Sequence, residues 1–157
     1  MTLHLGASNI GHNRVLVTVS HRSPTAAVPV STQWFIYSLT GEVEYYAVQI
    51  EPIDGPSNPS GVFDTQLVRV GDSVVAFGTL ALDDAREQAV HHWFMHVYCI
   101  ATGEWREIPY VAGESPTHRG FPHLFAVDDT VVLTGGGIED IDCDTWEWSI
   151  CTERWTK

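Results

Sequence analysis

Short apolar runs alternate with polar turns along this chain, and the clearest case lies in its last third. Residues 124–127 (Leu-Phe-Ala-Val) and 131–134 (Val-Val-Leu-Thr) flank a turn that contains Asp128 and Asp129. Two β-type runs joined by so short a turn predict a β-hairpin. Gly135, Gly136 and Gly137 follow the second run, where we expect the backbone to need positive φ angles or a close approach.

The same pattern recurs upstream. Residues 74–78 match residues 131–135 at a separation of 57, and an aromatic residue stands seven positions before a tryptophan in both Tyr98–Trp105 and Trp148–Trp155. A weaker copy comes first along the chain, at 15–19 and 34–43, and lacks the closing tryptophan. Repeats of roughly 50 residues with about four short strands each are typical of the blades of a β-propeller. The sequence therefore predicts an all-β fold of repeated blades.

At these positions the chain resembles the kelch-repeat family of β-propellers. The third copy matches the family pattern at Arg119, His123, Gly135, Gly136, Trp148 and Trp155. The middle copy matches it at Gly78, Tyr98 and Trp105, with Thr79 in place of the second glycine, and the first copy keeps Tyr37. The resemblance implies structural roles for these repeat residues and covers nearly the whole chain.

The pattern assigns one domain, 1–157, with blades of four antiparallel strands at about 1–50, 63–109 and 119–157. The predicted strands are 2–6, 14–20, 33–39, 42–49, 63–70, 73–79, 92–100, 104–109, 120–127, 130–136 and 145–151. Only a stub, 154–157, is left for the last outer strand. A propeller closes with about four to eight blades, and this chain supplies about three. We expect a half propeller that a second copy, a partner chain or a longer polypeptide completes.

The predicted connections fall into two sets on opposite rims. The tight set consists of 71–72, 128–129, 40–41 and 102–103. The long set consists of 21–32, 80–91, 137–144, 51–62 and 110–119, and it holds most of the prolines, as loops should because proline cannot donate to a central strand ladder. Long loops on a rigid scaffold usually carry binding function. The long-loop rim is the candidate working face.

Charge and cysteine content narrow the function classes. The 8 Lys+Arg against 20 Asp+Glu give a net charge of −12, which disfavours nucleic acid and anionic membrane surfaces as partners. No apolar run reaches transmembrane length and no secretion signal begins the sequence, so we expect a cytoplasmic protein. The three cysteines fit a reducing compartment. A disulfide between Cys143 and Cys151 stays open as an alternative.

Two clusters suggest metal sites. His92 and His96 share a strand face but lie about 13 Å apart at 3.3 Å per residue, too far to hold one ion. Asp140, Asp142 and Asp144 match the first calcium-ligand positions of an EF-hand loop, whose later Gly and Glu are here Thr145 and Cys151. We therefore expect packed histidines, a surface acidic loop with weak cation binding left open, and no cofactor.

The sequence has no recognisable nucleophile, phosphate-binding or zinc-protease motif. It favours a non-catalytic scaffold or adaptor that binds a protein, with a basic surface favoured, through the long-loop face. The predicted contact residues are Arg22, Arg86, His118, Arg119 and Trp146. The predicted acidic field consists of Asp83, Asp84, Glu139, Asp140, Asp142 and Asp144. Two alternatives stay open: an enzyme whose site forms only when the propeller closes, and a structural subunit of a larger complex.

Overall fold

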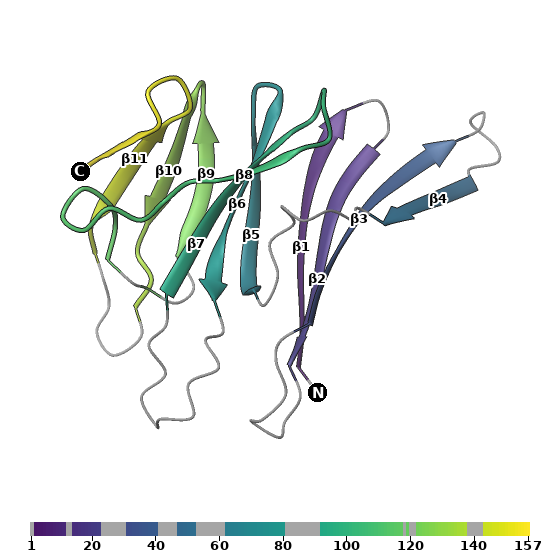
Figure 1. Cartoon of the computed structure of the whole chain (residues 1–157), viewed down its shortest axis with the longest axis horizontal. Helices are drawn as coiled ribbons and strands as arrows, with labels where there is room; N and C mark the ends of the chain where they lie inside the picture. The colour runs from purple at the N-terminus through teal and green to yellow at the C-terminus, as the bar shows by residue number, and fades with distance from the viewer. Residues whose placement is uncertain are drawn as a thin grey trace.

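The chain forms three antiparallel β-sheets (Figure 1). The computed structural model describes residues 2–11, 14–22, 31–40, 47–52, 62–80, 92–117, 119, 122–137 and 143–157. All regular secondary structure in these residues is β-strand, which confirms the predicted all-β class. Within this part of the chain no helix is long and apolar enough to cross a membrane.

Each sheet is a four-stranded meander in which consecutive strands pair. The first sheet contains β1 (Thr2–Gly11), β2 (Arg14–Arg22), β3 (Ser31–Thr40) and β4 (Ala47–Pro52). The second contains β5 (Val62–Val70), β6 (Ser73–Leu80), β7 (His92–Cys99) and β8 (Trp105–Glu107). The third contains β9 (His123–Val127), β10 (Thr130–Thr134), β11 (Thr145–Ser149) and β12 (Arg154–Thr156).

The tight turns form where the sequence predicts them. Val70 pairs with Ser73 across Gly71 and Asp72, and Val127 pairs with Thr130 across Asp128 and Asp129. Gly71 and Asp128 adopt positive φ angles of 55° and 50°. Such angles match the twist of a two-residue hairpin and suit Gly and Asp better than most residues. These turns fix the strand register of both sheets.

The outer strands are short. β12 pairs with β11 over three residues, inside the stub that the sequence predicts at 154–157, and is as long as β8. Trp155 stabilises this short strand, since it pairs with Trp148 and is only 9% exposed. The outer strand of the first sheet overlaps the predicted 42–49 and continues to Pro52, where the sequence predicts a loop. The predicted two-residue turn at 40–41 leads into residues 41–46, which lie outside the described residues.

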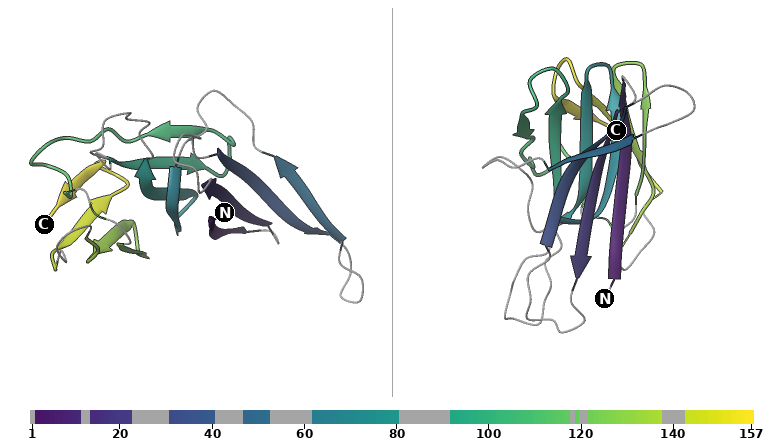
Figure 2. Two further views of the ribbon diagram at one scale, coloured as in Figure 1. Left: turned by 90° about the horizontal axis from the view of Figure 1, so that it is seen from below. Right: turned by 90° about the vertical axis from the view of Figure 1, so that its right-hand side faces the viewer.

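The sheets stand side by side as a fan, with their first strands adjacent (Figures 1 and 2). β1 packs next to β5, and β5 packs next to β9. Between the first and second sheets, Trp34 lies 4.6 Å and Tyr98 lies 5.0 Å from Trp105, measured between ring centroids. At the joint between the second and third sheets, the rings of Phe77 and Trp93, both from the second sheet, stack with their centroids 5.3 Å apart. Large aromatic residues therefore fill both joints.

The first strands also touch through the backbone. A Cβ atom on Gly6 would lie 2.7 Å from the carbonyl oxygen of Thr65, so only glycine allows this approach of β1 to β5. At the next joint the Gln66 amide donates to the carbonyl of Pro122 and accepts a 2.9 Å hydrogen bond from the backbone N–H of Leu124. Each joint thus combines an apolar core with a close approach to a backbone carbonyl at the first strands.

Candidate functional site

The segment that links β8 to β9 crosses from the second sheet to the third and is fixed at several points. The backbone N–H of Ile108 donates to Met95 O over 2.8 Å, and the indole N–H of Trp93 donates to Pro116 O over 2.9 Å. Between these anchors the N–H of Val111 donates to the buried Ser115 Oγ over 3.2 Å. These hydrogen bonds therefore anchor residues 108–117, in which the structure shows no strand.

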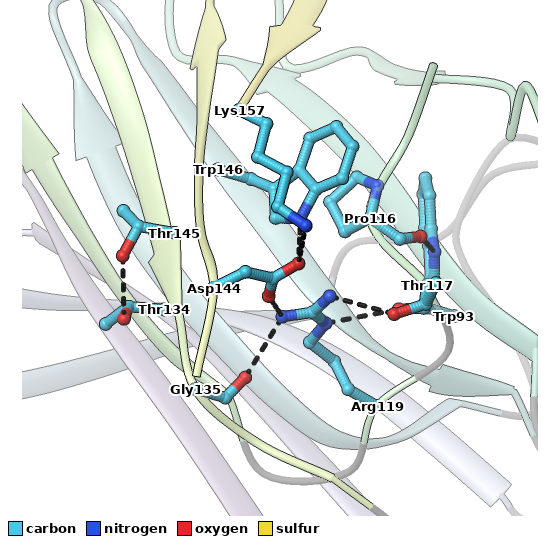
Figure 3. A network of polar contacts seen from close by, with 10 residues as sticks. All are labelled: Trp93, Pro116, Thr117, Arg119, Thr134, Gly135, Asp144, Thr145, Trp146 and Lys157. Atoms are coloured by element: carbon cyan, nitrogen blue, oxygen red, sulfur yellow. Dashed lines mark hydrogen bonds and ion pairs between the residues drawn. The ribbon is translucent and has the colours of Figure 1, made fainter. Parts of the chain in front are cut away.

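Arg119, in this segment, carries a buried charge, and Figure 3 shows its polar contacts. Its side chain is 0% exposed, and Nη1 lies 2.5 Å from Asp144 Oδ1 and donates to Gly135 O over 3.3 Å. Nε and Nη2 donate to the carbonyl and hydroxyl oxygens of Thr117 over 3.2 and 2.9 Å. A buried guanidinium requires such acceptors, because the charge has lost its hydration.

Asp144 connects this buried arginine to the surface. Its Oδ2 accepts a 2.8 Å hydrogen bond from the indole N–H of Trp146 and lies 3.0 Å from Nζ of Lys157. The Arg119 hydrogen bond holds the pKa of Asp144 well below its usual range; Lys157 and Trp146 act in the same direction, while burial opposes them. The carboxylate therefore stays charged and positions Trp146.

The glycines after β10 give the chain the shape this network needs. Gly135 and Gly136 have positive φ angles of 65° and 87°, a conformation that costs a residue with a side chain roughly 1–2 kcal/mol. In this turn the carbonyl of Gly135 accepts a hydrogen bond from Arg119, and the N–H of Gly135 donates to the carbonyl of Asp144 over 3.3 Å. The predicted need for backbone freedom at these glycines is confirmed.

A groove of about 670 Å³ opens beside the network, between the β8–β9 segment and the end of the third sheet. It is lined by Ile108, Pro109, Val111, Gly113, Glu114, Ser115, Trp146, Glu153, Arg154, Trp155, Thr156 and Lys157. We call it the Trp146 groove. Val111 on its wall is 44% exposed, and the neighbouring Tyr110 is 45% exposed. Large apolar side chains therefore meet solvent at this place.

Charged residues surround these apolar walls. Glu114 and Glu153 line the groove together with Arg154 and Lys157. Glu153 pairs with Arg106 over 2.5 Å between two half-exposed side chains. The ammonium of Lys157 lies 5.6 Å from the centroid of the Trp146 ring, within range of a cation–π contact. An apolar floor with a charged rim is the usual anatomy of a protein-binding surface.

The structure describes the side chains of three of the predicted contact residues. Trp146 lines the groove. Arg119 is buried, so its side chain stabilises the segment instead of facing a partner, and Asp144 is engaged by this arginine. Arg22 ends β2, and only its backbone is described. The others lie outside the described residues: Asp83, Asp84, Arg86, His118, Glu139, Asp140 and Asp142.

The sequence did not single out Val111 and Lys157, which line the groove, or Tyr110, which lies beside it. The local signal for Tyr110 and Val111 is a connection that contains proline and glycine, and Lys157 lies outside it. The anchor that turns this connection into a wall joins Trp93 to Pro116, 23 residues apart. A contact between residues so distant in sequence has no local pattern.

The repeat residues lie in the sheet joints. Tyr98 and Trp105 are buried between the first and second sheets, and Trp148 and Trp155 between the second and third. Gly78 is buried in β6.

The candidate metal and thiol residues have other surroundings. His96 is half-buried beside Phe94 and Trp105; burial lowers the pKa of its imidazole, while Glu107 acts in the opposite direction. Cys143 and Cys151 are exposed, and the length of β11 separates them. A disulfide between these two cysteines does not form in this structure. Of the acidic loop, only Cys143 and Asp144 belong to the described residues.

Comparisons with known proteins bear on the fold. No protein-family model matches the sequence, and no curated protein matches it. The structure is similar to that of YjhT, with a TM-score of 0.66 over 97% of this chain at 13% sequence identity. The aligned region covers 44% of YjhT, so this chain spans less than half the length of that protein. At this identity, the likeness establishes a shared fold.

Proposed function

We propose that the protein is a non-catalytic interaction scaffold whose three sheets are kelch-like blades of a partial β-propeller. The arrangement supports this, because three four-stranded meanders stand as a fan with their first strands adjacent. The aromatic pairs of the second and third repeats, Tyr98–Trp105 and Trp148–Trp155, lie in joints between sheets. A rigid scaffold of this kind presents its connections as binding surfaces.

The Trp146 groove is the proposed binding surface, and its combination of exposed apolar walls with fixed positions is the observation that carries the proposal. Tyr110 and Val111 expose nearly half of their surfaces there, while hydrogen bonds hold the segment that carries them. Aromatic residues in preformed pockets supply much of the energy of protein interfaces. The net charge of −12 favours a partner with basic side chains around an apolar anchor.

A site-specific cross-linking experiment tests the groove. A photoreactive amino acid is placed at Tyr110, and at Asp72 in the β5–β6 turn as the matched exposed control. We expect the Tyr110 position, and not the Asp72 position, to cross-link a partner protein in cells. The affinity of that partner for the purified chain is then measured by calorimetry.

Removing the aromatic ring at the rim should weaken the complex. Tyr110→Ala should raise the dissociation constant by roughly tenfold or more, as truncation of an aromatic anchor does, while Asp72→Ala should leave it unchanged. Equal cross-linking at both positions, or partners that bind the Tyr110→Ala chain with unchanged affinity, would refute the proposed surface.

A further inference from the structure

The strand registers identify equivalent positions in the three sheets. Counting from each first hairpin, three valines occupy the same place, and each pairs with an aromatic residue on the third strand of its sheet. The pairs are Val15 with Tyr37, Val74 with Tyr98, and Val131 with Trp148. The sheets can therefore be compared residue by residue.

Each such pair lies on the sheet face that meets the preceding sheet. Val74 and Tyr98 are buried against the first sheet, and Val131 and Trp148 against the second. The equivalent face of the first sheet has no sheet of this chain against it among the described residues. That face, which we call the back face, carries Val15, Val17, Val19, Phe35 and Tyr37, all half-buried.

The third sheet leaves the opposite face open. Its inner part carries Phe125, Val127 and Val132, and Phe125 and Val127 are 45% and 52% exposed. We call this the front face. The corresponding faces of the first and second sheets are covered by the next sheet, with Leu16 and Val75 fully buried at the position of Val132. The fan therefore ends in two complementary faces, one at each side.

A close approach to a backbone carbonyl repeats at equivalent positions of the first strands. Gly6, Gln66 and His123 are equivalent, because they pair with Thr18, Phe77 and Thr134. Gly6 approaches the carbonyl of Thr65, and Gln66 donates to the carbonyl of Pro122. Thr65 and Pro122 are also equivalent to each other, because they directly precede Gln66 and His123. His123 is exposed on the front face. At the equivalent place in the other two sheets, the strand lies against a backbone carbonyl of the following sheet.

We propose that the front face of the third sheet binds the back face of the first sheet in a second copy of this chain, and that two such joints close a ring of six sheets. The imidazole of His123 then donates to the carbonyl of Leu5 in the second copy, the position equivalent to Thr65. This arrangement rests on the proposed propeller and continues the joints that already exist within the chain. Two contacts between unlike faces close symmetrically, as in cyclic oligomers.

One observation favours a second copy over further sheets of the same chain. The outer part of the front face is polar, with Thr145 and Glu147 where the first sheet has the apolar Trp34 and Ile36. Apolar centres with polar margins characterise interfaces between separate chains.

Light scattering across a wide dilution range tests the joint. We expect the chain to have a mass of twice 17.4 kDa. Phe125→Glu on the front face should raise the dimer dissociation constant roughly thirtyfold or more, as loss of a central anchor does. His123→Ala should raise it about fivefold, for one hydrogen bond. Tyr110→Glu is the matched control, because Tyr110 is exposed to the same 45% as Phe125 but lies beside the groove.

Mixing variants tests which faces meet. Phe125→Glu blocks the front face, and Tyr37→Glu blocks the back face. Each variant alone should be a monomer, while the mixture should form a heterodimer through its one intact joint. If either variant alone still dimerises, like faces pair and the proposed arrangement is wrong. Val127→Glu provides a second front-face variant, and circular dichroism checks that every variant is folded.

The result also separates this inference from the proposed function. A wild-type chain that stays monomeric at all concentrations, or a dimer that withstands Phe125→Glu, overturns the joint. The Trp146 groove is then still tested by its own partner, because Tyr110→Glu should abolish partner binding without changing the mass. Loss of both properties in either variant alone would show that the two surfaces are not distinct.

Discussion

Replacing Asp144 with alanine removes the carboxylate that lies 2.5 Å from the buried Arg119. The Arg119 side chain is 0% exposed and that of Asp144 is 19% exposed, so water replaces little of the lost interaction. Removing one partner of a buried ion pair costs about 3–5 kcal/mol. Because Asp144 is partly exposed, we expect Asp144→Ala to lower the free energy of unfolding by about 3 kcal/mol, at the lower end of this range.

Urea denaturation followed by tryptophan fluorescence measures this loss, and Lys157→Ala is the control. Lys157 contacts the same carboxylate, but its side chain is 61% exposed, so its removal should cost below about 1 kcal/mol. A chain with Arg119→Met and Asp144→Leu together should be more stable than Asp144→Ala alone, since no charge is then left buried. Equal losses for Asp144→Ala and Lys157→Ala would refute the reasoning.

Three further predictions concern the joints and the same carboxylate. Gly6→Val should lower the unfolding free energy by about 1–3 kcal/mol through overpacking against Thr65, whereas Val at the exposed neighbour Ala7 should change it little in the same urea assay. Trp148→Ala empties a fully buried site in the second joint and should cost about 3–5 kcal/mol in thermal unfolding. Because the pKa of Asp144 is depressed in the folded protein, its carboxylate stabilises the fold above a pH of about 4. This stabilisation is lost as the pH falls below that value. The acid-induced drop in stability should therefore be shallower in Asp144→Asn.

The sequence predicted most strands because alternation and turn chemistry are local. The hairpin at Asp128 and Asp129 needs only a two-residue turn between apolar runs, and it forms there. The outer strands are harder to predict, and that of the first sheet extends to Pro52, beyond the predicted 42–49. β12 has three residues, too few for a period-two pattern, and pairing of Trp155 with Trp148 stabilises it. Tertiary packing therefore decides these short strands.

Arg119 shows why the site was harder to predict than the fold. An arginine in a long loop is usually exposed, so the sequence favoured a contact role for it. The compensating carboxylate lies 25 residues later at Asp144, beyond the reach of any local pattern. The groove was equally hard to predict, because its walls come from two separate parts of the chain, the β8–β9 segment and the end of the third sheet.

The buried network and the groove depend on each other. One oxygen of Asp144 binds Arg119, while the other binds both Trp146 and Lys157. Trp146 belongs to β11 and Lys157 follows β12, so this carboxylate fixes the wall of the groove from two strands at once. A partner that enters the groove meets an aromatic ring that is already positioned, and binding need not pay to order it. The charge that costs energy to bury at Arg119 thus preorganises the surface that we propose binds the partner.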